Sequence, residues 1–168
     1  MFFRIISAVM FSVAGAVTGI FFSERLKLNL DFCRNIHELL LNTAVIIRCR
    51  GDDVYSISAE LKRNNQFNDF TFLQEIPEKY NPEENFREIW IDAVKSQKNL
   101  PDDVKNLLCD FGIVLGQSDI EGQLVSMEAL TENAVILEKK HSEIYSQKGK
   151  LYRSVGMLFG VMIGIIII

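Results

Sequence analysis

Few residues of this chain have the types and spacing that chemistry needs. Cys33 and His37 stand four residues apart on one predicted helix face, the nearest approach to a metal-binding or nucleophile pair. Gly149-Lys150 is the only Gly-Lys pair, which a nucleotide-binding P-loop would require. However, Ile144 stands where the first glycine of that motif belongs, and Leu151 where its hydroxyl residue belongs. The sequence therefore argues against a P-loop.

The remaining candidate groups have simpler structural explanations. A small apolar cysteine and a half-buried histidine on a core-facing helix account for Cys33 and His37 better than a ligand pair does. The carboxylate pairs stand at predicted helix starts, where capping explains them: Asp52-Asp53, Glu83-Glu84 and Asp102-Asp103. We expect no catalytic residue, no metal site and no cofactor, so the chain is predicted not to be an enzyme.

The charged residues that surround these groups are unevenly placed along the chain. Of 168 residues, 48% are hydrophobic, 18 are basic and 22 are acidic. All 22 acids and 17 of the bases lie between Glu24 and Arg153, so this middle section carries a net charge of −5 and both ends are almost wholly apolar. A net-negative middle argues against a nucleic-acid partner. The pattern predicts a globular domain tethered to a membrane.

The amino-terminal segment, residues 2–22, is predicted to be a transmembrane helix. From Ile5 to Phe22 no residue is charged, and such a helix is about 27 Å long, close to the thickness of the hydrocarbon core. A cleaved export signal is the alternative, with Arg4 as its charged start and Ala14-Gly15-Ala16 as the cleavage site. The apolar run continues for six residues past Ala16, which favours an uncleaved anchor.

The carboxyl-terminal segment, residues 154–168, is the second predicted transmembrane helix, although it is short for a bilayer. Gly156, Gly160 and Gly164 stand four residues apart on one helix face, as do Ala8, Ser12 and Ala16, while Gly15 and Gly19 make a further pair. Small residues at this spacing let two helix backbones approach closely in a membrane. The sequence leaves open whether these glycines pack within the chain or between chains.

Basic residues flank both segments on their inner sides. The larger cluster precedes the second segment: Lys139, Lys140, Lys148, Lys150 and Arg153. Because positive residues prefer the cytoplasmic side, the middle domain is expected in the cytosol. The same cluster is a candidate for binding anionic lipid head groups. The three well-separated cysteines agree with a reducing compartment.

The middle domain, residues 23–153, is predicted to be an all-α antiparallel bundle. Its apolar positions recur at three and four residues, and no stretch alternates in the manner of a strand. The expected helices continue from the first span to about Arg50, and then cover 53–63 and about 68–75, with others opening at Asn81-Pro82, Pro101-Asp102 and Asp119. The last should run for roughly 35 residues into the terminal segment without a break.

The turn before that last helix contains the most distinctive residues. Gly116 can end the preceding helix in the left-handed conformation, and Ser118 with Glu121 forms a capping box. Asp119 complements the helix dipole. A well-made helix corner therefore explains Leu115, Gly116, Ser118, Asp119 and Gln123, which are also the candidate partner-binding residues.

This corner, together with Trp90 and the tail pattern Leu-Tyr-x-x-x-Gly-x-Leu-x-Gly from Leu151 to Gly160, resembles the stage III sporulation protein AB family. The resemblance extends over the whole chain. That family usually carries a Tyr-Gly-x-x-Pro-Leu-like stretch after its first soluble helix. Here Arg50-Gly51-Asp52-Asp53-Val54-Tyr55 occupies that place, matching the glycine and lacking the proline.

The resemblance implies a cytosolic six-helix bundle similar to the platform protein of type II secretion. It implies a subunit of the channel between mother cell and forespore, in the mother-cell membrane. The partners it implies are a secretion-type ATPase similar to stage III sporulation protein AA, other channel membrane proteins, and the lipid bilayer. A homo-oligomer is a further possibility. The alternative is a membrane-anchored helical adaptor or sensor with no part in secretion.

Overall fold

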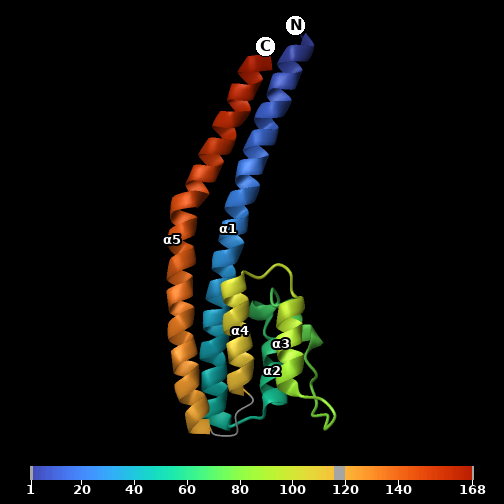
Figure 1. The fold of residues 1–168 in the computed structure, drawn as a ribbon, viewed down its shortest axis with the longest axis vertical. Coiled ribbons are helices and arrows are strands. Elements are labelled where there is room, and N and C mark those ends of the chain that lie inside the picture. Colours follow the sequence, from blue (N-terminus) through green and yellow to red (C-terminus); the bar gives the residue numbers. More distant parts are fainter. Residues whose placement is uncertain (1, 116–119, 168) are drawn as a thin grey trace. The chain divides into compact units, whose positions relative to one another are not determined.

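A computed structural model of the chain describes residues 2–115 and 120–167, and the side chains of 2–8, 11, 164 and 167 fall outside that description. The described residues form five α-helices and two short 3-10 helices, without a strand. In chain order these are α1 (Phe2–Arg50), α2 (Val54–Arg63), η1 (Asn65–Phe67), η2 (Thr71–Glu75), α3 (Phe86–Ser96), α4 (Asp102–Leu115) and α5 (Ile120–Ile167) (Figure 1). The all-α prediction is confirmed, whereas a six-helix bundle is not found.

The chain divides into two compact units. We call Met1–Leu30 with Lys139–Ile168 the hairpin unit, and Asp31–Glu138 the compact domain. Helices α1 and α5 contribute to both, as the unbroken 49-residue and 48-residue helices show. The predicted continuity of the first and last helices is therefore confirmed.

No helix among the described residues contains an apolar stretch long enough to cross a bilayer. The predicted transmembrane helices at 2–22 and 154–168 are thus not found in the described part of the chain. Both predicted spans include side chains that lie outside it.

The compact domain is organised around Trp90 of α3, which is fully buried. Its ring lies edge-on to Phe72, at 5.2 Å between centroids, and to Phe111 of α4, at 5.3 Å. Its indole nitrogen donates a hydrogen bond to the carbonyl oxygen of Leu108 at 2.8 Å. Phe86 completes the cluster at 5.8 Å. Because aromatic burial contributes heavily to a small core, these contacts hold α3 against α4.

The predicted helix at about 68–75 is wrong in type, because this stretch is a series of 3-10 turns. The backbone amides of Phe67, Phe70, Leu73 and Ile76 each donate a hydrogen bond to the carbonyl oxygen three residues earlier. These four side chains are all buried, and their spacing of three residues is the period of a 3-10 helix. Buried Gln97 fixes the stretch further, accepting from Phe72 N at 3.2 Å and donating to a neighbouring carbonyl.

The helix predicted to open at Asn81-Pro82 begins four residues later. The Asn81 side chain accepts from Glu83 N at 3.2 Å, which makes a turn. Asn85 is the residue that caps α3, accepting from Arg87 N at 3.1 Å. Asparagine is a good cap at both positions, and burial of Phe86 directly after Asn85 selects the later one.

Candidate functional site

The predicted corner lies where α4 ends and α5 begins. Leu115 is buried at the end of α4, and buried Gln123 donates from Nε2 to the Leu115 carbonyl at 3.3 Å. This bond satisfies one of the last carbonyls of α4, which has no partner within its own helix. Gly116, Ser118 and Asp119 lie outside the described residues, so the capping box stays a prediction.

A pocket of about 840 Å³ opens beside this corner, wholly within the compact domain. Three segments far apart in the sequence line it: the loop after α1 with the start of α2, the segment leading into α3, and the corner. The lining residues are Gly51, Asp52, Asp53, Val54, Tyr55, Ile57, Tyr80, Glu84, Asn85, Phe86, Arg87, Ile113, Leu115, Ile120 and Gln123. The corner and the loop that matches the family's glycine therefore meet at one site.

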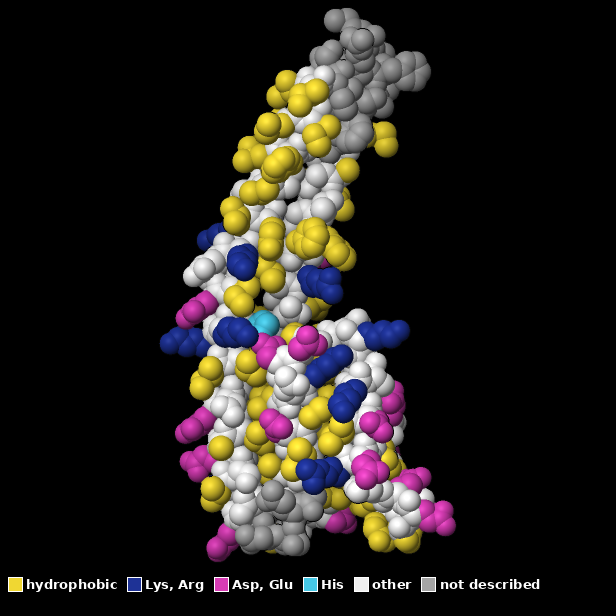
Figure 2. Space-filling model, in the orientation of Figure 1, with side chains coloured by type: hydrophobic (Ala, Val, Ile, Leu, Met, Phe, Trp, Pro, Cys, Tyr) yellow, Lys and Arg dark blue, Asp and Glu magenta, His cyan; other side chains and the backbone are white. Residues whose placement is uncertain are grey.

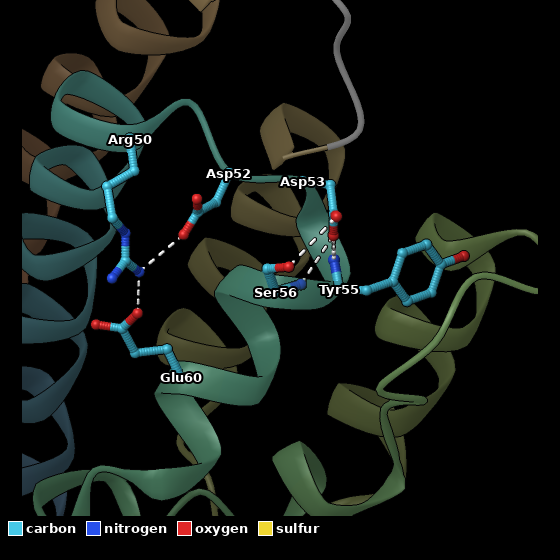
Figure 3. A network of polar contacts seen from close by, with 6 residues as sticks. All are labelled: Arg50, Asp52, Asp53, Tyr55, Ser56 and Glu60. Atoms are coloured by element: carbon cyan, nitrogen blue, oxygen red, sulfur yellow. Dashed lines mark hydrogen bonds and ion pairs between the residues drawn. The ribbon is translucent and has the colours of Figure 1, made fainter.

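Local backbone chemistry builds the loop on one side of the pocket. Gly51 ends α1 with φ at +62° and donates from its amide to the Ile47 carbonyl at 3.0 Å. Glycine suits this left-handed position because it has no Cβ. Asp53 then caps α2, accepting from the amides of Tyr55 and Ser56 at 2.8 Å each (Figure 3). The predicted end of the first helix at about Arg50 is confirmed.

Ion pairs fix the same loop from its neighbouring helices. Arg50 lies 2.8 Å from Asp52 and also pairs with Glu60 of α2 (Figure 3). The Glu60 carboxylate, aided by Asp52, raises the pKa of Arg50. The loop is thus held by a cap, a helix stop and two ion pairs, which gives the pocket a fixed wall.

Aromatic side chains form a further part of the wall. The Tyr55 ring lies edge-on to Phe86, at 5.3 Å between centroids, and to Tyr80, at 5.9 Å. Tyr55 is buried, whereas Tyr80 is 72% exposed and Ile120 is 50% exposed. Burial raises the pKa of Tyr55 above its ordinary value, with Tyr80, Glu84 and Asp53 contributing.

The pocket combines apolar surface with charged groups. Its mouth combines exposed apolar atoms with carboxylates at Asp52 and Glu84 and one guanidinium at Arg87. Aromatic and aliphatic surface with a charged rim is typical of protein–protein contact. Among the described residues, no group of three His, Cys, Asp or Glu could hold a metal ion. Cys33 is buried in the core, and His37 Nδ1 lies 3.3 Å from Glu138, which also pairs with Arg34.

The predicted glycine motif packs within the chain. A Cβ atom at Gly15 would lie 2.6 Å from the carbonyl oxygen of Gly156, and one at Gly19 would lie 2.5 Å from that of Tyr152. Gly160 also contacts Gly15, and its carbonyl accepts from Ser12 Oγ at 3.3 Å. The contacts of α1 with α5 move to lower residue numbers in α5 as they move to higher numbers in α1. The two helices are therefore antiparallel in the hairpin unit. Gly164 lies in α5, and its contacts are outside the part of the chain that the structure describes.

The basic cluster is exposed along α5 of the hairpin unit, as Figure 2 shows for several Lys and Arg side chains. Lys139, Lys140, Lys148 and Lys150 all face solvent. Arg153 differs because it also contacts α1, donating from Nε to Ser23 Oγ at 2.9 Å. It lies near the Tyr145 hydroxyl as well, at 3.4 Å.

Sequence reasoning missed most of the pocket. Tyr80, Glu84 and Arg87 come from a segment that reads only as a turn and a helix start. The one available signal was Gly51, which matches the family's loop, followed by Asp53 in capping position. The tertiary packing of α1, α3 and α4 places that loop beside the corner. No local sequence pattern predicts this proximity.

The described residues form an all-helical fold with a paired-helix unit and a compact helical domain that carries a pocket. The chain belongs to the stage III sporulation protein AB family, which matches residues 4–168. Membership gives it a role in stage III of sporulation. No curated protein and no solved structure matches the chain.

Proposed function

We propose that the chain is a non-enzymatic membrane platform subunit of the channel between mother cell and forespore. Its compact domain docks a cytosolic secretion-type ATPase similar to stage III sporulation protein AA. The observation that carries this proposal is the pocket at which the family's corner and its glycine loop meet. A site where the family's corner meets a loop that matches the family at Gly51 is the best candidate for a shared partner.

Packing in the hairpin unit supports attachment to a membrane. The closest backbone contacts between its helices are at small or polar positions, such as Gly15, Gly19 and Gly156, and one ring contact, Phe22 with Tyr152 at 5.8 Å between centroids, lies beside them. Its large apolar side chains instead point outward: Val9, Met10, Val13, Val17, Ile20, Phe21, Phe22, Leu28, Leu151, Tyr152, Met157, Leu158, Phe159, Val161, Met162, Ile163, Ile165 and Ile166 (Figure 2). Small residues inside and apolar residues outside is the arrangement expected in lipid, where close backbone approach drives association. We propose that this unit is a bilayer-embedded hairpin.

The charges support an orientation. The hairpin unit has eight basic and two acidic residues, a net charge of +6, whereas the compact domain has ten basic and twenty acidic residues, a net charge of −10. Lys139, Lys140, Lys148, Lys150 and Arg153 supply most of the excess and suit the anionic cytoplasmic leaflet. The compact domain then lies in the cytosol of the mother cell, where an ATPase can reach it.

Paired charge reversals test the docking site. Glu84 lines the pocket and Glu83 does not, although both are exposed and adjacent in sequence. With tagged full-length chain, Glu84→Lys and Ile120→Asp should each reduce recovery of the ATPase about fivefold or more, because rim charge and apolar contact are lost. Glu83→Lys should leave recovery unchanged. Asp119→Lys and Gly116→Trp at the corner should act like the pocket variants.

Two results would overturn the assignment. One is full ATPase recovery with folded Glu84→Lys and Ile120→Asp chains, whose folding is checked by helical circular dichroism. The other is an equal loss with Glu83→Lys, which would show a general charge effect. A deletion strain that completes spore development would contradict the sporulation role itself.

A further inference from the structure

The compact domain has a second exposed surface, on the outer faces of α1 and α5. Seven large hydrophobic side chains of the described compact domain are exposed, and two of them, Tyr80 and Ile120, belong to the corner pocket. Of the other five, Leu41, Val45 and Val125 line one groove, Ile136 lies on the same face of α5 as Val125, and Val135 is exposed elsewhere on α5. Val45 is 61% exposed, Val125 69% and Ile136 64%. Such a concentration of exposed apolar side chains is unusual for a surface facing only water.

A groove of about 510 Å³ runs between the two helices at this surface. It is lined by Leu41, Ala44, Val45, Arg48, Leu124, Val125, Glu128, Thr131 and Glu132. We call this set the α1–α5 groove. Its walls cover roughly two turns of each helix, about 10–12 Å, and Ile136 continues the Val125 face for one more turn. A further helix of three or four turns could pack into it, ridge into groove.

The charges select the kind of helix. Glu128 and Glu132 stand on the α5 wall against a single base, Arg48, in a domain whose net charge is −10. A second copy of the chain packed on this groove would bring four glutamates together with two arginines, an excess of negative charge that is unfavourable. A basic helix would pair with them instead.

We propose that the α1–α5 groove binds an amphipathic basic helix of a partner protein. Apolar residues of that helix, spaced by three and four, contact Leu41, Val45 and Val125. Its lysines or arginines pair with Glu128 and Glu132. The α1–α5 groove and the corner pocket share no lining residue.

The test uses full-length chain in a non-ionic detergent, which carries no charge to attract a peptide. The probe is a fluorescent 18-residue synthetic helix with leucines on one face and lysines beside them, and a second peptide has glutamates in place of the lysines. Fluorescence anisotropy should show binding of the lysine peptide and at least about tenfold weaker binding of the glutamate peptide.

Variants locate the binding on the surface. Val125→Ser should lower the affinity for the lysine peptide by about fivefold. The double change Glu128→Lys with Glu132→Lys should lower it by about tenfold or more. The matched control is Glu83→Lys with Asp92→Lys, which alters the net charge equally at exposed positions outside the groove. It should change the affinity less than twofold.

Three outcomes would overturn the proposal. The first is equal weakening by the groove and control doubles, which would show bulk attraction to an acidic domain. The second is no binding of the lysine peptide at all. The third is a wild-type dimer in sedimentation that Val125→Ser dissociates, which would show that a second copy covers the groove. ATPase recovery in the pocket variants is a separate readout, so either proposal can fail alone.

Discussion

Gly112 of α4 decides how closely Trp90 can approach. A Cβ atom at this position would overlap the Trp90 ring, with the indole Cδ1 as its nearest neighbour. Trp90 cannot move aside, because it is fully buried, its nitrogen bonds Leu108, and Phe72 and Phe111 flank the ring. The glycine is therefore a packing requirement and not a source of flexibility.

We expect Gly112→Ala to lower the free energy of unfolding by about 1–3 kcal/mol, the usual cost of overpacking a core. Helix propensity alone favours alanine by about 1 kcal/mol, so the sign of the effect separates the two causes. Asn106→Ala is the control, since Asn106 lies on the same helix and is exposed. Denaturant unfolding followed by tryptophan fluorescence measures both. A stabilised Gly112→Ala chain would show that the ring does not pack as described.

Tyr55 carries the clearest pH dependence. Burial raises its pKa above the value of about 10 expected in the unfolded chain. A raised folded pKa stabilises the protein fully below the unfolded value, and this contribution is lost as pH rises through the folded one. The loss therefore falls in the alkaline range.

Between pH 9 and 11, the free energy of unfolding of the wild type should decrease more steeply than that of Tyr55→Phe, which has no hydroxyl to ionise. The same substitution at exposed Tyr152 is the control and should keep the wild-type slope. Parallel slopes for wild type and Tyr55→Phe would mean that this hydroxyl ionises as freely in the folded state as in the unfolded one.

At the scale of elements, α1 and α5 are joined in the hairpin unit by backbone contact. Gly15, Gly19 and Gly156 bring main chain against main chain, and Ser23 lies 3.3 Å from where a Gly149 Cβ would stand. Ser23→Cys with Gly149→Cys, in a chain lacking the native cysteines, should therefore form a disulfide readily.

Gly19→Val should reduce formation of that disulfide severalfold, because its side chain would meet the Tyr152 carbonyl and the Gly156 backbone. Ala14→Val adds similar bulk at an exposed position of the same helix and should have little effect. Non-reducing electrophoresis after mild oxidation gives the yield. Equal yields in both variants would show that the glycines do not form the contact between the helices.

The sequence predicted those elements whose signals are local and long. Apolar spacing of three and four, with no proline after Pro101, was enough for α4 and for an unbroken α5. The helix type predicted for residues 68–75 was wrong because five buried apolar residues within ten positions fit either an α-helix or 3-10 turns. Hydrogen bonds with the Gln97 side chain, which is distant in sequence, stabilise the 3-10 turns. The predicted helix start at Asn81 was wrong because Asn81 and Asn85, four residues apart, are both suitable N-caps, and Asn85 is the one that caps α3.

The candidate site was less predictable than the fold. Leu115 and Gln123 were identified because a corner has a local signature, and both line the pocket. Tyr80 and Glu84 reach the same pocket only through the packing of α3 on α4, for which no spacing rule exists. The α1–α5 groove likewise depends on two helices about eighty residues apart in sequence lying side by side.

For the whole molecule, charge and hydropathy are divided between the two units. A net charge of +6 accompanies the apolar hairpin unit and −10 the compact domain. Such a division suits a chain that contacts anionic lipid with one part and basic protein surfaces with the other. The same division would be costly in a single water-soluble body, where so many outward apolar side chains favour aggregation.

Insertion of the hairpin unit into a bilayer is the physical basis of the proposed platform role. The most direct measurement is flotation of membranes from sporulating cells after an alkaline carbonate wash, with the full-length chain followed by immunoblot. We expect the chain to float with the membranes, because outward apolar side chains of both helices hold it in lipid. Recovery of the chain in the carbonate supernatant, with its first 22 residues intact, would contradict the membrane hairpin and the platform built on it.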